Sequence, residues 1–372
     1  MDVSRFLASH VRPIDSSGIR RVFDLGASLT DPIDLSIGQP DFPVPGPVKD
    51  AMVRAIQEDH NGYTVTRGLP ALRDRIRAAL QEEFDWSPDV LVTSGVSGAL
   101  LLALMVCVNP GDEVIIGDPY FVSYKHLVRL VHGRPVIVDL YDDFQLHPER
   151  FEAALSERTK LLLICSPSNP TGVVHREADV RALCEIARQR NLLIISDEIY
   201  RALCYDDPSP SPVRFAPERT LLLRGFAKSH AMTGLRMGYA AGPEGIVGEM
   251  AKIQQYTFVC APHPAQYGAL AAMDTDVSPQ VQQYRAKRDL VCGLLQGAYD
   301  FVRPSGGFYL FPKAPLRFRS ASALVEEAIR RKVLVIPGSV FSERDTHFRI
   351  SYAAPDEKLR AGCEILCALA RA

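Results

Sequence analysis

Between about residues 90 and 240 the sequence repeats one unit: a short apolar run, a turn rich in Gly, Pro or Ser, and a segment with helical periodicity. Continuous apolar runs bounded by turn residues are typical of strands buried on both faces of a sheet. Between two runs, Glu177 to Gln189 places Val180, Leu183, Cys184 and Ala187 on one helical face. Strands that alternate with amphipathic helices predict an α/β fold with a largely parallel sheet. The runs are Glu113–Ile116, Pro135–Val138, Leu161–Ile164, Leu192–Ile195 and Leu221–Leu223.

The two ends of the chain show other patterns. A length of 372 residues is too great for one ordinary core, so more than one domain is expected. The first 45 residues contain five prolines and little periodicity, which predicts an arm that packs over another part of the molecule. After about residue 280 a long helical segment precedes short strands, which indicates a smaller α+β domain. The predicted division is an arm over 1–45 that includes part of the small domain, a large domain over 46–275 and a small domain over 276–372.

Charge and cysteine content exclude several classes of function. Lys and Arg number 42 against 44 Asp and Glu, a net charge of -2 without a polybasic block, so no nucleic-acid partner is expected. The eight cysteines form no C-x-x-C pair and no zinc-type cluster, which predicts reduced core residues of a cytoplasmic protein and no metal site. The start of the chain lacks the pattern of a signal peptide, and the longest apolar stretch, Ala99–Val108, is too short to span a bilayer. No membrane association is expected.

The residues that follow the apolar runs are the most informative, because ligands of open α/β sheets bind at the carboxyl ends of strands. Lys228 comes shortly after Leu221–Leu223, and Arg236 follows eight residues later among glycines. A lysine amine can form a Schiff base with an aldehyde, and an arginine can bind phosphate through its fork of donors. The pair suits a covalent aldehyde site with an anionic handle, although a solvated lysine and a surface arginine are the simpler explanation.

Two further strand ends carry side chains that a pyridine ring could use. Asp197 follows Leu192–Ile195, with the phenol of Tyr200 three residues later, and a carboxylate beside a pyridine nitrogen keeps that nitrogen protonated. The alternative is that Asp197 caps the next helix. Asn169 stands in the rigid turn after Leu161–Ile164, where it either donates to a phenolate or carboxylate or serves turn chemistry alone.

Other segments offer an anion cradle, aromatic rings and a buried arginine. A Gly-rich turn in Thr93–Leu100 opens a helix and points free backbone amides outward, although many helices begin with Ser and Gly. Asp118–Tyr124 offers rings that either stack on a flat cofactor or join the core. Arg349 lies inside an apolar run, where its partner is either a substrate carboxylate or a structural Asp or Glu.

In combination these residues resemble one family, the class I and II aminotransferases, which are pyridoxal-phosphate enzymes of fold type I. The resemblance covers nearly the whole chain, from Leu35–Phe42 through Asn61–Thr64 to Arg349–Ala353. Its most specific motifs are Asn169-Pro-Thr-Gly, Asp197-Glu-Ile-Tyr200 and Lys228 with Arg236. It implies a large domain with a mostly parallel sheet of the seven-stranded type, pyridoxal 5'-phosphate as cofactor, and ping-pong transfer of an amino group from an L-amino acid to a 2-oxo acid.

The resemblance also implies a role for each matching residue. Lys228 matches the lysine that holds the cofactor as a Schiff base and shuttles the proton, and Asp197 matches the partner of the pyridine nitrogen. The amine must be neutral to act as a base. Burial and the nearby positive charge of Arg236 are expected to lower the pKa of Lys228 and so to favour the neutral form. The other cofactor residues implied are Tyr200 and Asn169 at the ring hydroxyl, Phe121 on the ring face, and Arg236, Ser97 and the backbone amide of Val96 at the phosphate.

Substrate and partner-subunit contacts follow in the same way. Arg349 matches the anchor of the substrate α-carboxylate, and Gly38 and Asn169 are implied to contribute to that site. Tyr63 matches a tyrosine that reaches the phosphate in the other subunit, which implies a homodimer. Gly225 departs from the pattern, because many members carry a hydroxyl residue three positions before the lysine, so one phosphate hydrogen bond is expected to be missing.

Two alternatives to transamination accompany this interpretation. A C–S β-lyase on the same fold would use the same residues to expel a sulfur leaving group. A non-catalytic sensor of this fold would need a DNA-binding domain, for which the chain has no room. The substrate is open, and the unplaced candidates for a second cation are Arg20, Arg21, Arg67 and Arg201. The candidates for the wall of an aromatic or aliphatic site are Tyr63, Tyr124, Phe258 and Tyr309.

Overall fold

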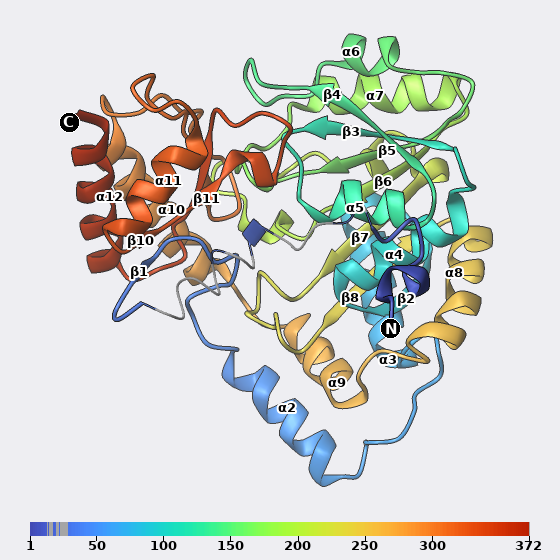
Figure 1. Cartoon of the computed structure of the whole chain (residues 1–372). Coiled ribbons are helices and arrows are strands. Elements are labelled where there is room, and N and C mark those ends of the chain that lie inside the picture. The colour runs from blue at the N-terminus through green and yellow to red at the C-terminus, as the bar shows by residue number, and fades with distance from the viewer. Residues whose placement is uncertain (13, 15–17, 20–21, 23–28, 372) are drawn as a thin grey trace.

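A seven-stranded sheet forms the centre of the computed structural model, which describes residues 1–12, 14, 18, 19, 22 and 29–371 (Figure 1). The strands, in spatial order, are β2 (Asp89–Ser94), β8 (Met237–Gly242), β7 (Thr220–Gly225), β6 (Leu193–Asp197), β5 (Thr159–Cys165), β3 (Glu113–Asp118) and β4 (Arg134–Asp139). Within the described residues all of them run in one direction except β8, which is antiparallel to β2 and β7.

The five apolar runs predicted as strands fall on β3, β4, β5, β6 and β7, which confirms the predicted α/β fold with a largely parallel sheet. Successive side chains of a strand point to opposite faces of its sheet. In β5, Leu161 and Leu163 therefore contact one core, while Leu162 and Ile164 contact the other. The runs are continuously apolar because both faces of the sheet are covered.

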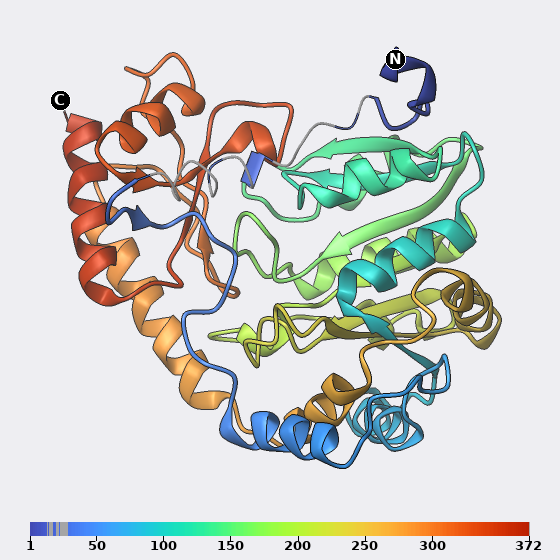
Figure 2. The same ribbon diagram turned by 60° about the horizontal axis from the view of Figure 1, so that its bottom comes forward.

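Helices cover both of these faces (Figures 1 and 2). One face packs against α4 (Gly95–Cys107), α5 (Ser123–Leu130) and α8 (Glu244–Thr257). The other packs against α3 (Pro70–Phe84), α6 (Pro148–Ala153), α7 (Glu177–Gln189) and α9 (His263–Ala272). The predicted helix at Glu177–Gln189 is α7, and its predicted apolar face is buried. α2 (Gly46–Gln57) lies along α9 at the bottom of Figure 1.

The C-terminal part forms a smaller α+β unit, on the left of Figure 1. Its antiparallel sheet consists of β11 (Ile336–Pro337), β12 (Phe348–Ser351) and β9 (Tyr309–Leu310), with β12 in the middle. β1 (Ile33–Asp34) pairs in parallel with β10 (Val333–Leu334), so the N-terminal arm joins this unit. The helices of the unit are α10 (Ser278–Leu295), α11 (Ala321–Arg330) and α12 (Asp356–Arg371). The smaller α+β part is confirmed, and its boundaries stay a prediction.

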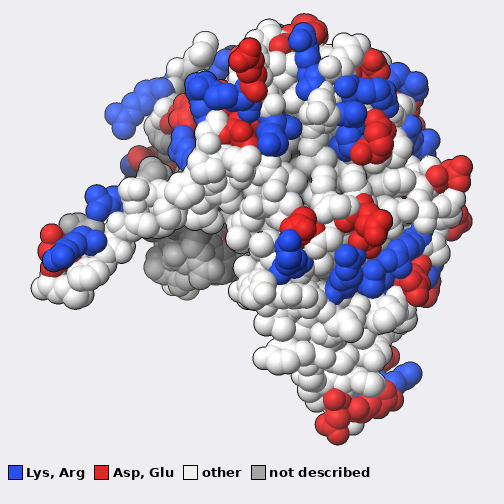
Figure 3. Space-filling view, turned by 90° about the vertical axis from the view of Figure 1, so that its right-hand side faces the viewer, with Lys and Arg blue, Asp and Glu red and all other residues white. Residues whose placement is uncertain are grey.

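Short 3-10 helices complete the described elements: η1 (Val3–Phe6), η2 (Arg201–Leu203), η3 (Pro212–Arg214), η4 (Pro217–Arg219) and η5 (Gly338–Val340). Within the described residues, no helix combines the length and the apolar character needed to cross a bilayer. On the face shown in Figure 3, basic and acidic side chains are interspersed, and the tapering lower part carries few charges above its tip.

Leu162, in the middle of β5, gives a test of the buried sheet because its side chain is fully buried. Leu162→Ala should lower the free energy of unfolding by about 2–5 kcal/mol, because the lost volume cannot be refilled by its neighbours. Urea unfolding followed by circular dichroism measures the change. Leu316→Ala is the matched control, since Leu316 is 95% exposed. Equal destabilisation by both substitutions would contradict this placement of β5.

Candidate active site

A cavity of about 510 Å³ opens at the carboxyl ends of the parallel strands, where β9 and β12 of the smaller unit approach the sheet. A volume of this size suits a small-molecule ligand. All of the site residues predicted from the sequence line it except Tyr63. These lining residues are Gly38, Val96, Ser97, Phe121, Asn169, Asp197, Tyr200, Lys228, Arg236 and Arg349.

One end of the cavity is built to hold an anion. α4 begins at Gly95 directly after β2, and no side chain caps it, so the amides of its first turn are available to a ligand. Arg236 lies against this turn. Its Nη2 atom is so close that a Cβ added to Gly95 would stand only 2.6 Å from it. Arg236 Nη1 donates to the carbonyl of Thr233 at 2.9 Å. No carboxylate among the described residues forms an ion pair with Arg236, which leaves its charge for a phosphate.

The backbone of Arg236 is held in an unusual conformation. Its φ angle is 55°, in the left-handed region that residues other than glycine rarely adopt. Such strain is found where the surrounding structure requires one particular side-chain position. Here that position brings the guanidinium group to the first turn of α4.

Asp197, at the end of β6, provides a buried carboxylate at the floor of the cavity. Its Oδ2 accepts a hydrogen bond from the Tyr124 hydroxyl at 2.8 Å, and its Oδ1 accepts one from the Ile199 amide at 3.2 Å. Burial raises the pKa of Asp197 to about 6, against the opposing effect of the Tyr124 hydrogen bond. The following 3-10 turn begins at Arg201 with Tyr200 at its N-cap, so Asp197 does not cap a helix.

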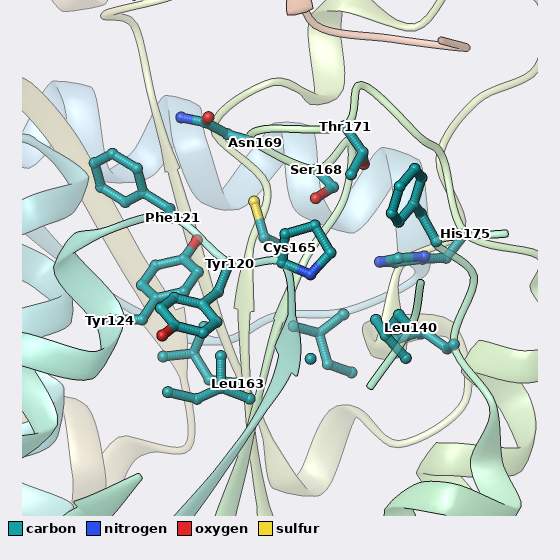
Figure 4. A pocket seen from close by; sticks show the side chains of 16 residues that line it. Tyr120, Phe121, Tyr124, Leu140, Leu163, Cys165, Ser168, Asn169, Thr171 and His175 are labelled. Carbon is teal, nitrogen blue, oxygen red and sulfur yellow. The ribbon is translucent and has the colours of Figure 1, made fainter. Parts of the chain in front are cut away.

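The side chains around this floor come from the ends of β3 and β5 and the segments that follow them. Figure 4 shows Phe121 and Tyr124 on one side of Cys165 and Asn169 above it, at the border between the main cavity and a much smaller one. Phe121 packs edge-on against Tyr124, with ring centroids 5.6 Å apart. An aromatic wall thus stands beside the buried carboxylate, as a flat cofactor ring would require.

Lys228 reaches into the cavity, and its Nζ donates to the carbonyl oxygen of Gly38 at 2.5 Å. Burial, followed by the positive charges of Arg349 and Arg236, lowers the pKa of Lys228 to about 8, although the negative charge of Asp197 opposes this. The pKa is therefore lowered for the predicted causes, and Arg349 adds to them. A surface lysine in a solvated loop does not fit this position.

Arg349 is a fully buried cation on β12. Its Nη1 donates to Asn169 Oδ1 at 3.0 Å and its Nη2 to the Ser36 carbonyl at 2.6 Å, while its Nε has no partner. The guanidinium group also lies 4.4 Å from the ring centre of Tyr309 and 4.8 Å from that of Phe341. Among the described residues no Asp or Glu pairs with it, so the structural carboxylate considered for Arg349 is not found there. An uncompensated buried charge is costly, which favours an anionic ligand beside it.

Two tyrosines near the site have roles that sequence reasoning missed. The sequence offers Tyr124 as a stacking ring, a core residue or a wall residue, yet its hydroxyl is the hydrogen-bond donor to Asp197. The hydroxyl of Tyr309 lies 2.9 Å from that of Tyr200, and a Cβ added to Gly38 would stand 2.5 Å from it. A buried phenol needs a hydrogen-bond partner, which was the available signal for Tyr124, whereas nothing in the sequence pointed to the Tyr200 contact.

Several sequence candidates lie elsewhere. Tyr63 is 85% exposed and outside the cavity of its own chain. Arg67 pairs with Asp89 and Arg201 pairs with Glu83, so neither supplies a second substrate cation to this cavity. Arg20 and Arg21 lie outside the described residues. Phe258 does not line the cavity.

Steric crowding explains why position 225 is a glycine and not a hydroxyl residue. A Cβ there would stand 2.8 Å from the Met237 carbonyl oxygen and 3.0 Å from the Gly238 Cα. Strands β7 and β8 approach too closely at this point for a hydroxyl side chain. A phosphate in this site would depend on Arg236 and the turn of α4 instead.

The sequence matches the family model for aminotransferase class I and II over residues 30–366. This chain belongs to the class I and II aminotransferases. This aminotransferase is 39% identical to the putative aminotransferase YugH of Bacillus subtilis, with 96% of each chain covered. It is 36% identical to the probable aspartate aminotransferase of Methanocaldococcus jannaschii, with 97% of this chain and 98% of the relative covered.

Solved structures agree with the sequence relatives. The aspartate aminotransferase from Thermus thermophilus with maleate superposes with a TM-score of 0.94 at 34% identity, over 98% of this chain and 99% of that one. The aspartate aminotransferase of Thermotoga maritima gives a TM-score of 0.93 at 34% identity, over 97% of this chain and 99% of that one. Fold type I and a pyridoxal-phosphate-dependent aminotransferase function follow for this chain.

The residues of the cavity fit that cofactor. Arg236 and the uncapped first turn of α4 suit its phosphate, and Asp197 offers a buried carboxylate to a pyridinium nitrogen. The amine of Lys228, whose pKa is lowered to about 8, suits an aldehyde. The fit rests on three separate groups of this chain.

The lowered pKa of Lys228 gives a pH prediction for the cofactor-free protein. Only a neutral amine reacts with fluorodinitrobenzene, so the rate of Lys228 modification should rise with pH, with a midpoint near 8. Arg349→Gln removes a nearby positive charge and should move the midpoint of this profile upward. Mass spectrometry of the Lys228 peptide measures the rate, with exposed Lys252 as an internal reference for the reagent. A midpoint above about pH 10, as for an ordinary lysine, would contradict the assigned environment.

Proposed function

We propose that this aminotransferase moves the amino group of an L-amino acid to a 2-oxo acid by a ping-pong reaction in which Lys228 carries the cofactor and moves the proton. The observation that carries this proposal is the position of Lys228, whose amine has a lowered pKa and lies among Asp197, Arg236 and Arg349. These groups supply, in one cavity, a covalent anchor, a ring partner and two anion sites.

The residues that would hold the cofactor come from successive strand ends. When bound, pyridoxal phosphate supplies an aldehyde for amines and a ring that takes up the electron pair released at the substrate α-carbon. Asp197 would hold the proton on the ring nitrogen, because a buried carboxylate favours a charged partner. The remaining contacts would be Arg236, Ser97 and the Val96 amide at the phosphate, Asn169 and Tyr200 at the ring hydroxyl, and Phe121 at the ring face.

Arg349 would orient the substrate through its α-carboxylate. Its buried guanidinium group presents an unpartnered Nε, and Asn169 fixes its Nη1. Bidentate arginine–carboxylate pairing gives both affinity and a defined orientation. With the carboxylate fixed, the α-carbon would be confined to the part of the cavity that Lys228 reaches.

Lys228 would then move the proton. Its Nζ must be neutral to accept the α-proton, and burial together with the charges of Arg349 and Arg236 favours that neutral form. The carbonyl of Gly38 accepts from Nζ and so holds the amine toward the substrate side of the cavity. The amino acid and the 2-oxo acid each carry a carboxylate on the reacting carbon, so one set of residues would serve both half-reactions.

Lys228→Ala should keep the fold and lower transamination by about 10²–10⁴-fold or more, because the proton carrier is gone. The assay is a panel of L-amino acid donors with 2-oxoglutarate or pyruvate as acceptor, together with circular dichroism to check folding. Lys252→Ala is the control, since Lys252 is an exposed lysine on α8. Borohydride treatment of the cofactor-loaded protein should attach the cofactor to Lys228 and to no other lysine.

Two outcomes would contradict the proposal. A fully active Lys228→Ala protein would remove Lys228 from the mechanism. Release of pyruvate and thiol from cystathionine without an added 2-oxo acid, in the absence of any transamination, would favour the C–S lyase instead.

We also propose that the working unit is a homodimer in which Tyr63 serves the partner's site. Tyr63 is 85% exposed and lies outside the cavity of its own chain. Large apolar side chains are exposed on α2, the segment after it and α8, which is unusual for a surface that faces only water. They are Val53, Ile56, Val65 and Tyr256.

Co-expression of two inactive variants tests this arrangement. In a mixed dimer of Lys228→Ala and Tyr63→Ala subunits, one site carries both substitutions and the other carries neither. Random assembly should therefore restore intact sites to about a quarter of the total. Activity at limiting cofactor measures the recovery, and the two variants mixed after separate purification, without subunit exchange, are the control. No recovery would place Tyr63 in its own chain's site or outside any site.

A cytoplasmic location is also part of the proposal. All eight cysteines are free thiols, and burial raises the pKa of seven of them, as at Cys107 and Cys363, because it disfavours the thiolate. Unpaired, unreactive cysteines are typical of proteins in a reducing compartment.

A further inference from the structure

Four charged side chains form a closed network beside the cavity. They are Glu83 at the end of α3, Glu198 directly after β6, Arg201 in η2 and Arg224 on β7. Two carboxylates face two guanidinium groups, so the ion network is neutral as a whole. None of its four members binds cofactor or substrate in the function proposed above.

Arg224 is the centre of the ion network. Its Nη1 donates to Glu83 Oε2 at 2.6 Å, and its Nε and Nη2 donate to Glu198 Oε2 at 3.0 and 2.8 Å. Arg201 Nε donates to Glu83 Oε1 at 2.7 Å and lies 3.8 Å from Glu198 Oε2. The Phe84 ring lies against both guanidinium groups, with centroid distances of 5.3 and 5.5 Å.

The network is shielded from water, which makes its charge balance important. The side chain of Glu198 is 2% exposed, those of Arg201 and Arg224 are 14% exposed, and that of Glu83 is 28% exposed. Burial tends to lower the pKa of Arg224, but Glu198 and Glu83 raise it overall. Removal of one member would leave a buried charge without its partner, which proteins tolerate poorly.

Three members of the network lie close in the sequence to a residue of the site. Glu198 is next to Asp197, Arg201 is next to Tyr200, and Arg224 precedes Lys228 by four residues. The Glu198 amide also donates to the Leu223 carbonyl at 2.9 Å, which ties the end of β6 to β7. The strands that deliver Asp197 and Lys228 are thus joined by both backbone and side-chain contacts.

We propose that the ion network of Glu83, Glu198, Arg201 and Arg224 positions Asp197 and Lys228, and that its neutrality sets the electrostatic environment in which both groups work. This inference rests on the function proposed above. The four residues are positioning residues, since they act through Asp197 and Lys228 and do not touch the reacting atoms.

The sign of the electrostatic effect follows from the charge that is removed. Loss of a carboxylate leaves the network with one excess positive charge, which favours the unprotonated form of every titrating group nearby. Loss of a guanidinium group leaves an excess negative charge and acts in the opposite direction. Burial is the main cause of the raised pKa of Asp197, and the negative charge of Glu198 already adds to it.

Other charges near the two groups stay constant in this comparison. Tyr239 on β8 interacts with Arg224, and Arg214 in η3 lies 5.8 Å from the Phe84 ring centre. Arg236 and Arg349 face Lys228 from the cavity side. Because none of these is altered, a change in the titration reports the charge of the ion network.

The test is a pH titration of the visible absorbance of the cofactor-loaded protein without substrate, so the readout does not depend on activity. Glu198→Gln and Glu83→Gln should lower the titration midpoint, and Arg224→Gln should raise it, each by about half a pH unit or more. The double variant Glu198→Gln with Arg224→Gln is neutral again and should return the midpoint toward that of the unaltered protein. Glu185→Gln and Arg188→Gln, which break an exposed pair on α7, should leave it unchanged.

Opposite shifts that cancel in the double variant would support the proposal, because a merely structural role predicts lower stability without a sign that follows the charge. Shifts in one direction for all variants, or none, would overturn it. If Glu198→Gln does not fold, Glu83→Gln decides the question, since Glu83 is the most exposed member. Borohydride attachment to Lys228 tests the proposed function separately, so its failure is distinguishable from failure of this inference.

Discussion

Parallel strand pairing in register is the constraint on which the site depends. Cys165 of β5 pairs with Asp197 of β6, so these two strands end level, and Asp197 pairs with Leu223 near the end of β7. The turns that follow them therefore meet at one edge, and Asn169, Asp197 and Lys228 reach the same cavity. A register slip of one residue would turn Asp197 to the opposite face of the sheet.

Electrostatics then gives this edge its chemistry. Arg236 and Arg349 have no carboxylate partner among the described residues, and each stands where an anion can reach it. The positive charges that suit a phosphate and a carboxylate also help to lower the pKa of Lys228. Anion binding and the neutral amine thus have a common physical cause, so a substitution that weakens one should disturb the other.

Segments distant from the sheet complete the cavity. The N-terminal arm brings the Gly38 carbonyl to Lys228 and the Ser36 carbonyl to Arg349. Arg349 itself comes from β12 of the smaller unit, which is held between β9 and β11. The ion network joins β6 and β7 to the end of α3. Main-chain carbonyls of the arm therefore contact Lys228 and Arg349, while ion pairs join the strands that carry Asp197 and Lys228.

The sequence alone determined which strand ends carry the functional residues. The apolar runs predicted β3 to β7. Asn169, Asp197 and Lys228 were recognisable at or shortly after the ends of these strands, because a strand and its following turn are continuous in the chain. Arg349 was recognisable as a charge inside an apolar run. These inferences needed only local pattern and motif spacing, which are properties of short segments.

Only the tertiary structure decided which side chains meet across long separations. Tyr124 donates to Asp197 over 73 residues, and Arg224 pairs with Glu83 over 141 residues. No local pattern encodes such pairs, because they depend on how helices pack on the sheet. The same packing withdrew Arg67 and Arg201 into ion pairs, left Tyr63 exposed, and allowed only glycine at position 225, where two strand backbones come too close for a side chain.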